Sequence, residues 1–304
     1  TNIAKVIMKN LIVCILGFRM VPNIQFIKEK QTPDTDFLFI SNPDMEAEDI
    51  RMYIKKAFKI DRNEMRPIVV DKFSAWELEE EFKKRDFEKY DKILVNVSEG
   101  TAIMVNATTE YFKDYVADIY YIPDNIDYMF QIFPKRKQGK IEIKNKIGLI
   151  EYVTSHGMEM RGGALSGIPL EYIKKYLHLY IGHESPRWKL LSQLRSYRFP
   201  RNKYRISMFP NLDLFLQEIE FPLADSTGEI ISGEEIRFLT GDWFEEYVYH
   251  RIKNEFGLSG NNIQSGVTLT TDGIMNEFDV LFFYKGMIYT IVCKTFSFYT
   301  SDAA

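Results

Sequence analysis

The stretch 92-KILVNVSEGTAIMVNATTEYFKDY-115 decides the fold, because an apolar run gives way to a helical pattern across a short polar loop. Residues 92–98 predict a buried strand, and residues 99–115 predict the helix that follows it. Similar strand-then-helix pairs come before it, at residues 11–30, 37–58 and 67–87. Buried strands that alternate with amphipathic helices are typical of a parallel sheet covered on both faces. The sequence therefore predicts an α/β fold whose N-terminal domain, residues 1–140, is a Rossmann-like parallel sheet.

The composition of the 304 residues limits the class of protein. Hydrophobic residues make up 45% and charged residues 27%, as in soluble globular proteins of two or three domains. The net charge of -4 gives no overall attraction to nucleic acid, so any such binding needs a local basic patch. No segment reaches the ~18 apolar residues of a membrane helix, and the apolar run at residues 11–18 is followed by no small-residue cleavage site. We therefore expect no membrane helix, no signal peptide and a cytoplasmic location.

The cysteines and histidines give no sign of a zinc site. Cys14 and Cys293 both lie in apolar, strand-like runs, which predicts two buried free thiols in a reducing compartment. Four histidines show no paired spacing with cysteine, namely His156, His178, His183 and His250. Structural zinc sites need such pairs, so we expect none here.

Two of the predicted strands end in loops that suit a phosphorylated ligand. Ligands bind parallel sheets at the carboxyl ends of the strands, where backbone N–H groups and helix N-termini accept phosphate. One loop, 17-GFRMVPN-23, carries a glycine, an arginine and an asparagine, and the other, 96-NVSEGTAIM-104, has Gly100 where a phosphate would approach the backbone. Neither G-x-x-x-x-G-K-[ST] nor G-x-G-x-x-G occurs, which excludes a nucleotide-hydrolysing P-loop and disfavours a dinucleotide oxidoreductase. A tight turn without any ligand explains each loop equally well.

Residues 141–235 are less regular, and we assign them to a connector. Basic residues gather at 187-RWKLLSQLRSYRFPRNKYR-205, interleaved with aromatic rings. A solvated surface explains such a run. A nucleic-acid surface, where cations meet phosphates and rings stack on bases, explains it equally well.

The C-terminal residues place charges in apolar surroundings. The pattern predicts a helix and three strands there, at residues 241–257, 266–271, 277–284 and 287–296. Asp279 and Lys294 fall inside the strands, and Glu245 or Glu246 is the acid of the helix. Two-metal phosphodiester hydrolysis needs carboxylates that converge on the cations, with a lysine near the scissile phosphate. A structural ion pair between Asp279 and Lys294 is the competing interpretation, and Glu277 shares a strand face with Asp279.

These two sets of residues together resemble a known family. The segment 96-NVSEGTAIM-104 resembles the N-x-T-G-G-T-K-x-M signature of CARF domains, the Rossmann-like sensors of cyclic oligoadenylates in type III CRISPR defence. The segments 238-FLTGDWFEEYVYHRI-252 and 275-MNEFDVLFFYKGMIYTIVCKT-295 resemble the restriction-endonuclease-like PD-(D/E)xK domain of CRISPR ancillary nucleases. The resemblance implies a homodimeric endonuclease, activated by cyclic tetra-adenylate, that uses Mg²⁺ or Mn²⁺ to cut DNA and, in some members, single-stranded RNA. It also implies that residues 236–304 form the nuclease-like α/β domain.

The resemblance assigns roles to individual residues. The ligand-binding positions are Gly17, Phe18, Arg19, Pro22, Asn23, Asn96, Ser98, Glu99, Gly100, Thr101 and Met104. The catalytic positions are Asp279, Lys294 and Glu245, with Glu246 as the adjacent alternative, and Asp279 and Glu245 are the implied metal ligands. Lys294 would orient the attacking water or stabilise developing charge.

The sequence departs from the family pattern in both domains. Ala102 replaces the lysine of the CARF signature and Glu99 replaces a glycine, so we expect a weaker attraction for a phosphate ring. Val292 stands where the glutamate of Glu-x-Lys belongs, which removes a metal ligand and predicts weak or absent catalysis. The family's nuclease domain continues with further helices and strands after the position of Lys294, so we expect residues 236–304 to hold an incomplete domain. The alternatives are a non-catalytic sensor of cyclic oligoadenylate and a ring nuclease, in which the CARF domain cleaves its own ligand.

Overall fold

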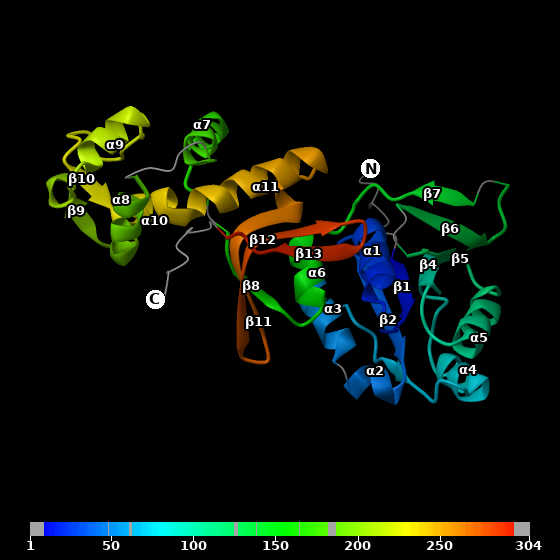
Figure 1. The fold of residues 1–304 in the computed structure, drawn as a ribbon. Coiled ribbons are helices and arrows are strands. Elements are labelled where there is room, and N and C mark those ends of the chain that lie inside the picture. Colours follow the sequence, from blue (N-terminus) through cyan, green and yellow to red (C-terminus); the bar gives the residue numbers. More distant parts are fainter. Residues whose placement is uncertain are drawn as a thin grey trace, which may run out of the picture. The chain divides into compact units, whose positions relative to one another are not determined.

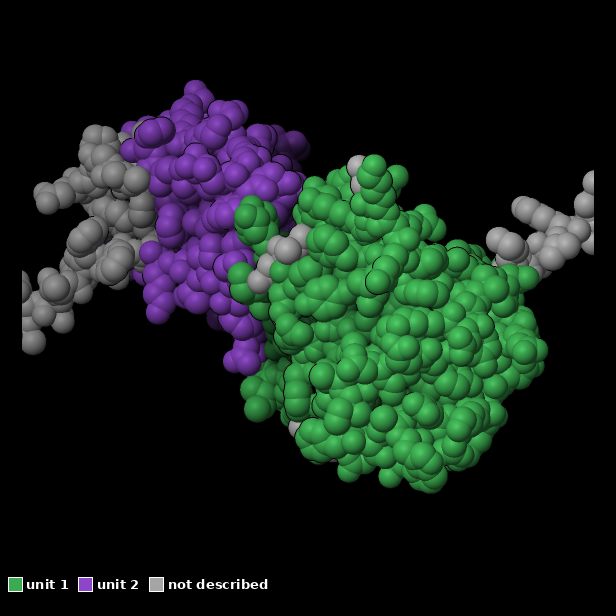
Figure 2. Space-filling model, turned by 90° about the vertical axis from the view of Figure 1, so that its right-hand side faces the viewer, with its two compact units in different colours: residues 1–160, 269–275, 283–288 green, residues 161–268, 276–282, 289–304 purple. Residues whose placement is uncertain are grey.

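The computed structural model describes residues 9–47, 49–60, 63–124, 127–137, 139–163, 165–181 and 187–294. The chain divides into two compact units, which Figure 2 distinguishes by colour. Unit 1 comprises residues 1–160, 269–275 and 283–288, and unit 2 comprises residues 161–268, 276–282 and 289–304. None of the helices that the structure describes combines the length and the apolar character of a membrane-crossing segment.

A seven-stranded sheet forms the centre of unit 1 (Figure 1). Its strands are β1 (Asn10–Ile15), β2 (Thr35–Ser41), β3 (Ile68–Val69), β4 (Lys92–Asn96), β5 (Ala117–Tyr121), β6 (Tyr128–Phe133) and β7 (Lys140–Glu142). Their order across the sheet is β3-β2-β1-β4-β5-β6-β7. The pairs from β3 to β5 are parallel, whereas β6 pairs antiparallel with both β5 and β7. The predicted Rossmann-like parallel sheet is therefore confirmed, with an antiparallel edge that the sequence pattern did not predict.

Helices cover both faces of this sheet (Figure 1). They are α1 (Met20–Lys30), α2 (Pro43–Ala47), α3 (Ile50–Phe58), α4 (Ala75–Lys83), α5 (Ala102–Phe112) and α6 (Leu149–Ser155). Helices α1, α3 and α6 pack against one another, and α4 and α5 pack against each other. Alternate residues of a strand point to opposite faces, and Leu11, Val13 and Ile15 of β1 join the core that includes residues of α4 and α5. Since helices cover both faces, β1 is apolar and buried from Leu11 to Ile15, which is why its sequence predicted a buried strand.

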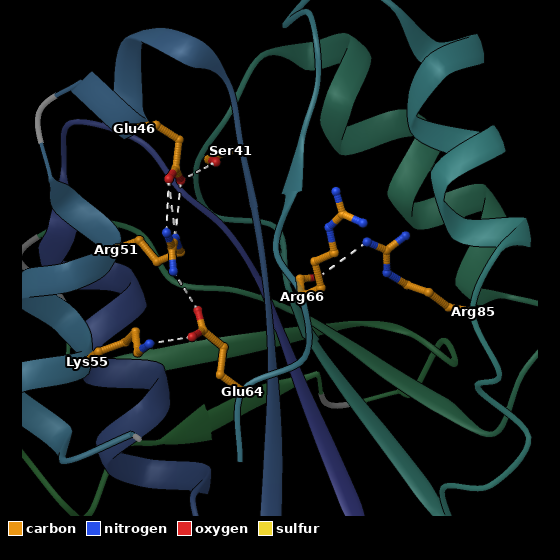
Figure 3. Close-up of polar contacts among 7 residues, drawn as sticks. All are labelled: Ser41, Glu46, Arg51, Lys55, Glu64, Arg66 and Arg85. Carbon is orange, nitrogen blue, oxygen red and sulfur yellow. Dashed lines mark hydrogen bonds and ion pairs between the residues drawn. The ribbon is translucent and has the colours of Figure 1, made fainter. Parts of the chain in front are cut away.

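The helix predicted within residues 37–58 is two helices, α2 and α3. They are separated at Asp49, whose φ of +54° is left-handed. Figure 3 shows the polar contacts at this break: Glu46 of α2 accepts from Arg51 of α3 at 3.1 Å and from Ser41 Oγ at 2.6 Å. These contacts stabilise a sharp turn that no glycine or proline marks in the sequence.

Unit 2 contains most of the remaining helices. They are α7 (Leu170–Ile181), α8 (Arg187–Leu194), α9 (Leu212–Glu218), α10 (Gly233–Arg237) and α11 (Trp243–Glu255). Short turns of 3₁₀ helix are η1 (Arg195–Tyr197), η2 (Ile206–Met208) and η4 (Gly260–Asn262), and η3 (Phe238–Asp242) is a π-helical turn. The strands β9 (Lys203–Arg205) and β10 (Ile230–Ser232) pair antiparallel. Trp243 at the start of α11 is 1% exposed and belongs to a core that α7, α8, α9 and α10 share.

A second sheet has the strand order β13-β12-β11-β8. Its strands are β8 (Glu159–Gly162), β11 (Ile263–Thr271), β12 (Ile274–Tyr284) and β13 (Met287–Ile291). The strand predicted over residues 287–296 therefore ends early, so Cys293 and Lys294 follow the strand instead of lying in it. Residues 295–296 lie outside the described residues. Cys14 is a buried free thiol as predicted, whereas Cys293 is only partly buried.

Candidate ligand and nuclease sites

Three buried polar side chains connect the carboxyl ends of β1 and β4. Asn23 Nδ2 donates to the carbonyl of Ile15 at 2.8 Å, and Asn96 Nδ2 donates to Asn23 Oδ1 at 2.7 Å. Ser98 Oγ donates to Asn96 Oδ1 at 2.5 Å and accepts from the backbone N–H of Ile122 at 2.7 Å. Buried polar groups are costly unless they are paired, and this chain of bonds pairs them. The buried side chains of Asn23, Asn96 and Ser98 therefore fix the positions of the loops at residues 17–23 and 96–104.

Helix α5 begins at the same edge of the sheet. Thr101 Oγ1 caps it by accepting from the backbone N–H of Met104 at 3.2 Å, and it donates to the carbonyl of Lys72 at 2.6 Å. The first N–H groups of a helix lack intrahelical partners and lie at the positive end of the helix dipole, which suits a phosphate. Gly100 precedes the cap with φ of +94°, and a Cβ there would lie 2.4 Å from Ile15 Cγ2. Met104 itself is buried in the core.

Gly100→Ala is expected to lower the free energy of unfolding by about 3 kcal/mol, because positive φ and the clash with Ile15 add together. Gly273→Ala is the matched control in the same unit, since Gly273 has φ of +79° but no atom within 4 Å of an added Cβ. It should cost only about 1 kcal/mol, the backbone part of the effect. Urea unfolding measures the free energy of unfolding of both variants. Equal losses of stability would show that the clash with Ile15 contributes nothing.

The loops at residues 17–23 and 96–104 form what we call the ligand edge of the sheet. Its acidic residue, Glu99, is paired with an arginine. Glu99 is 6% exposed, and its Oε1 lies 2.9 Å from Arg19 Nη2, while Arg19 Nη1 binds Asp124. Burial raises the pKa of Glu99, and Arg19 offsets part of that rise. A Cβ on Gly17 would lie 2.4 Å from Glu99 Oε2, so the glycine allows the carboxylate to pack against the first loop. Arg19 is therefore shared by two carboxylates, and Phe18 beside it is 70% exposed.

The two glutamates of α11 have different surroundings. Glu246 is 5% exposed and accepts from the backbone N–H of Ser166 at 2.6 Å and from its Oγ at 2.8 Å, so both carboxylate oxygens are used. Burial, and then the charges of Asp279 and Asp242, raise the pKa of Glu245 to about 7. Such a rise marks carboxylates brought together without enough cations to balance them. Glu245 is therefore the acid on which the charge of Asp279 acts, and Glu246 holds the loop that contains Ser166.

Asp279 lies on β12, and its Oδ2 accepts from the backbone N–H of Cys293, just after the end of β13, at 2.5 Å. Its own carbonyl accepts from Ser265 Oγ at 3.1 Å. Burial, and then the charges of Asp279 and Glu245, raise the pKa of the Cys293 thiol to about 12, so this thiol stays protonated beside the two acids. Lys294 is exposed. Within the described residues it forms no ion pair with Asp279, which removes the structural ion pair as an explanation for the two charges.

Few side chains near Glu245 and Asp279 could act as further ligands of a metal ion. Val292 is 63% exposed and offers no ligand atom, and Glu277 is exposed on β12. Over the described ranges, no three side chains of His, Cys, Asp or Glu come close enough together to hold a metal ion. Glu245 and Asp279 alone fit a Mg²⁺ ion, which keeps several waters and takes one or two protein carboxylates. Two carboxylates hold such an ion more weakly than three.

Comparison with protein families decides the identity of both regions. Residues 11–152 match the family model of the Card1 CARF domain, and residues 232–303 match the model of the Card1-like endonuclease domain. The chain belongs to the CARF-domain endonucleases of the Card1 type. Its CARF domain contains the whole ligand edge described above, and its endonuclease domain contains Glu245 and Asp279. No curated protein matches the chain significantly.

Solved structures show the same fold at low sequence identity. Can2 from Sulfobacillus thermosulfidooxidans, in complex with cyclic tetra-adenylate, is 18% identical with a TM-score of 0.62 over 94% of this chain and 80% of that one. Protein VC1899 from Vibrio cholerae is 16% identical with a TM-score of 0.65, over 96% and 82%. A type III CRISPR defence DNA nuclease activated by cyclic oligoadenylate is 13% identical with a TM-score of 0.56, over 93% of this chain but only 40% of its own.

Proposed function

We propose that this chain is a metal-dependent endonuclease that cyclic tetra-adenylate activates. The observation that carries the nuclease part is the electrostatic interaction of Glu245 and Asp279 inside the matched endonuclease domain, where burial and then the charge of Asp279 raise the pKa of Glu245 to about 7. Partly buried carboxylates that repel each other favour a bound cation. Hard divalent ions prefer such oxygen ligands, which supports Mg²⁺ or Mn²⁺ as the metal.

Each residue of the nuclease site then has a role. Glu245 and Asp279 would hold the metal ion, and the N–H of Cys293 keeps the Asp279 carboxylate oriented. A metal ion bound there would activate water and polarise the phosphodiester. The exposed ammonium group of Lys294 stabilises the negative charge that develops on the phosphate. The proposed substrate is DNA, with single-stranded RNA as the second candidate.

The ligand edge of the CARF domain supports a cyclic oligoadenylate as the activator. The first turn of α5 and the guanidinium of Arg19 suit phosphates, and the exposed ring of Phe18 suits stacking on adenine. Can2, which shares the fold, is in complex with cyclic tetra-adenylate. In a homodimer two such edges would face one ring across the two-fold axis, and binding would bias the positions of the nuclease domains.

A sensor without nuclease activity is the second candidate function. The exposed Val292 is the observation that favours it, because the position of the third carboxylate is empty. Titration calorimetry with cyclic tetra-adenylate, with cyclic hexa-adenylate as the ring-size comparison, tests the sensor. Cleavage of supercoiled DNA in Mn²⁺ tests the nuclease. Binding of cyclic tetra-adenylate without any DNA cleavage would favour the non-catalytic sensor over the nuclease.

Glu99→Gln is expected to tighten the binding of cyclic tetra-adenylate about fivefold, since removal of one negative charge near a phosphate contributes about 1 kcal/mol. The substitution also leaves Arg19 with one carboxylate partner in place of two. Glu88→Gln is the control, because Glu88 is exposed and precedes β4 at the opposite edge of the sheet. Calorimetry should show no change for the control. Weaker binding by Glu99→Gln would mean that Glu99 chiefly positions Arg19.

A further inference from the structure

Arginines from two other elements surround the first turn of α11. Arg237, at the end of α10, places Nε 3.2 Å from Asp242 Oδ2, and Arg198 places Nη2 3.7 Å from Asp242 Oδ1. Arg198 directly follows η1, which packs against α10 and begins with Arg195. The basic and aromatic segment at residues 187–205 therefore reaches the acids of the endonuclease domain. All of these residues lie within unit 2.

Among the residues that the structure describes, Asp242 is the one carboxylate that Arg198 and Arg237 contact directly, and it leaves a donor of this cluster without a partner. Partial burial lowers the pKa of Arg198; the charges of Asp242 and, more weakly, Glu245 oppose that fall, and the charges of Arg195 and Arg237 add to it. The buried Nε of Arg198 finds no hydrogen-bond acceptor in the part of the chain that the structure describes. Cations held together and partly out of water are costly unless an anion joins them. An anionic ligand would therefore stabilise this arrangement.

The cluster lies beside the nuclease acids. Asp242 and Glu245 are three residues apart in one helical run, so their side chains lie on the same face, and the charge of Glu245 acts on Arg198. Gly241 allows the guanidinium to approach the backbone, because a Cβ there would lie 2.5 Å from Arg198 Nη2. The backbone of Gly241 is extended in φ and non-helical (φ 178°, ψ -50°), so the chain kinks where Arg198 approaches it.

We propose that Arg198 and Arg237 bind a backbone phosphate of the nucleic acid next to Glu245 and Asp279. This inference rests on the proposed nuclease function and adds the part of the molecule that holds the substrate. Guanidinium groups match phosphate oxygens with paired N–H groups. Phosphate contacts fix the position of a nucleic acid without reading its sequence. Arg198 is thus a positioning residue that brings the scissile phosphodiester to the acids.

Fluorescence anisotropy of a labelled DNA duplex in EDTA tests this inference apart from cleavage. Arg198→Gln should weaken binding about tenfold and lower the slope of log Kd against log salt concentration by about 1. Arg198→Lys should recover part of the affinity because it keeps the charge but loses the paired donors. Arg201→Gln is the matched control, since Arg201 is exposed in the same segment. It should change the affinity less than about twofold. If Arg198→Gln fails to fold, Arg237→Gln replaces it, because that side chain is 44% exposed against 37% for Arg198.

The outcomes separate this inference from the nuclease itself. Equal losses in Arg198→Gln and Arg201→Gln would overturn the inference in favour of a diffuse basic surface. Unchanged KM for DNA cleavage in Arg198→Gln would also overturn it, although the nuclease would stand. Binding that depends on Arg198 in a protein that never cleaves DNA would support the phosphate site and contradict the nuclease.

Discussion

Val292→Glu is expected to raise the rate of DNA cleavage in Mn²⁺ about a hundredfold, which corresponds to about 2.7 kcal/mol of transition-state stabilisation. The new carboxylate would join Glu245 and Asp279, whose charges already meet. A third carboxylate would bind the metal ion more tightly and balance its charge. Because Val292 is 63% exposed, the substitution should cost little stability. Initial rates of supercoiled DNA cleavage over a series of Mn²⁺ concentrations measure both effects.

Val292→Gln is the control for this gain, because glutamine has nearly the shape of glutamate without its charge. It should cleave at the rate of the unchanged chain. The concentration of Mn²⁺ for half-maximal rate should fall for the glutamate variant only. If both variants cleave no faster than the unchanged chain, the missing carboxylate at position 292 does not limit the activity.

Asp279→Asn is expected to lower the cleavage rate at least about a hundredfold, the usual size of effect when one group that stabilises the transition state is removed. The substitution keeps an oxygen that accepts the N–H of Cys293, so the end of β13 should stay in place. It removes the charge that a metal ion needs. Where the unchanged chain cuts too slowly to measure, the Val292→Glu background supplies the reference rate.

Glu277→Gln is the matched control for Asp279→Asn. Glu277 lies two residues earlier on β12, so it shares a strand face with Asp279, but it is exposed. We expect its cleavage rate to stay within about threefold of the reference, as for a surface charge near a site. A loss at Glu277 equal to the loss at Asp279 would show that general negative charge on this face, and no specific ligand, supports the reaction.

The order of strands and helices in the CARF domain could be predicted, because β1, β2 and β4 are buried on both faces and each gives a continuous apolar run. β6 could not, because this strand mixes buried and exposed residues. The break between α2 and α3 at Asp49 could not be predicted from the sequence either. Contacts with residues outside the local pattern stabilise it, whereas glycine or proline would have marked it in the sequence.

The sequence could predict which residues are candidates for the nuclease site, but not which of them long-range contacts bring to it. The sequence names Glu245 and Glu246 as adjacent acids, and nothing local distinguishes them. Ser166, 80 residues away, uses both oxygens of Glu246, and this long-range contact decides the choice. In the same way, the sequence predicts that the negative charge of Glu99 weakens phosphate binding, but it does not show that Arg19 pairs with this carboxylate.

The most direct test of a cyclic oligoadenylate-activated nuclease is the cleavage rate of supercoiled DNA by the Val292→Glu chain in Mn²⁺, with and without cyclic tetra-adenylate. We expect the ligand to raise this rate at least about tenfold, a coupling of about 1.4 kcal/mol between the two domains. The unchanged chain should show the same dependence at a much lower rate. Cleavage at equal rates with and without a ligand that binds, or no cleavage in either condition, would contradict the account.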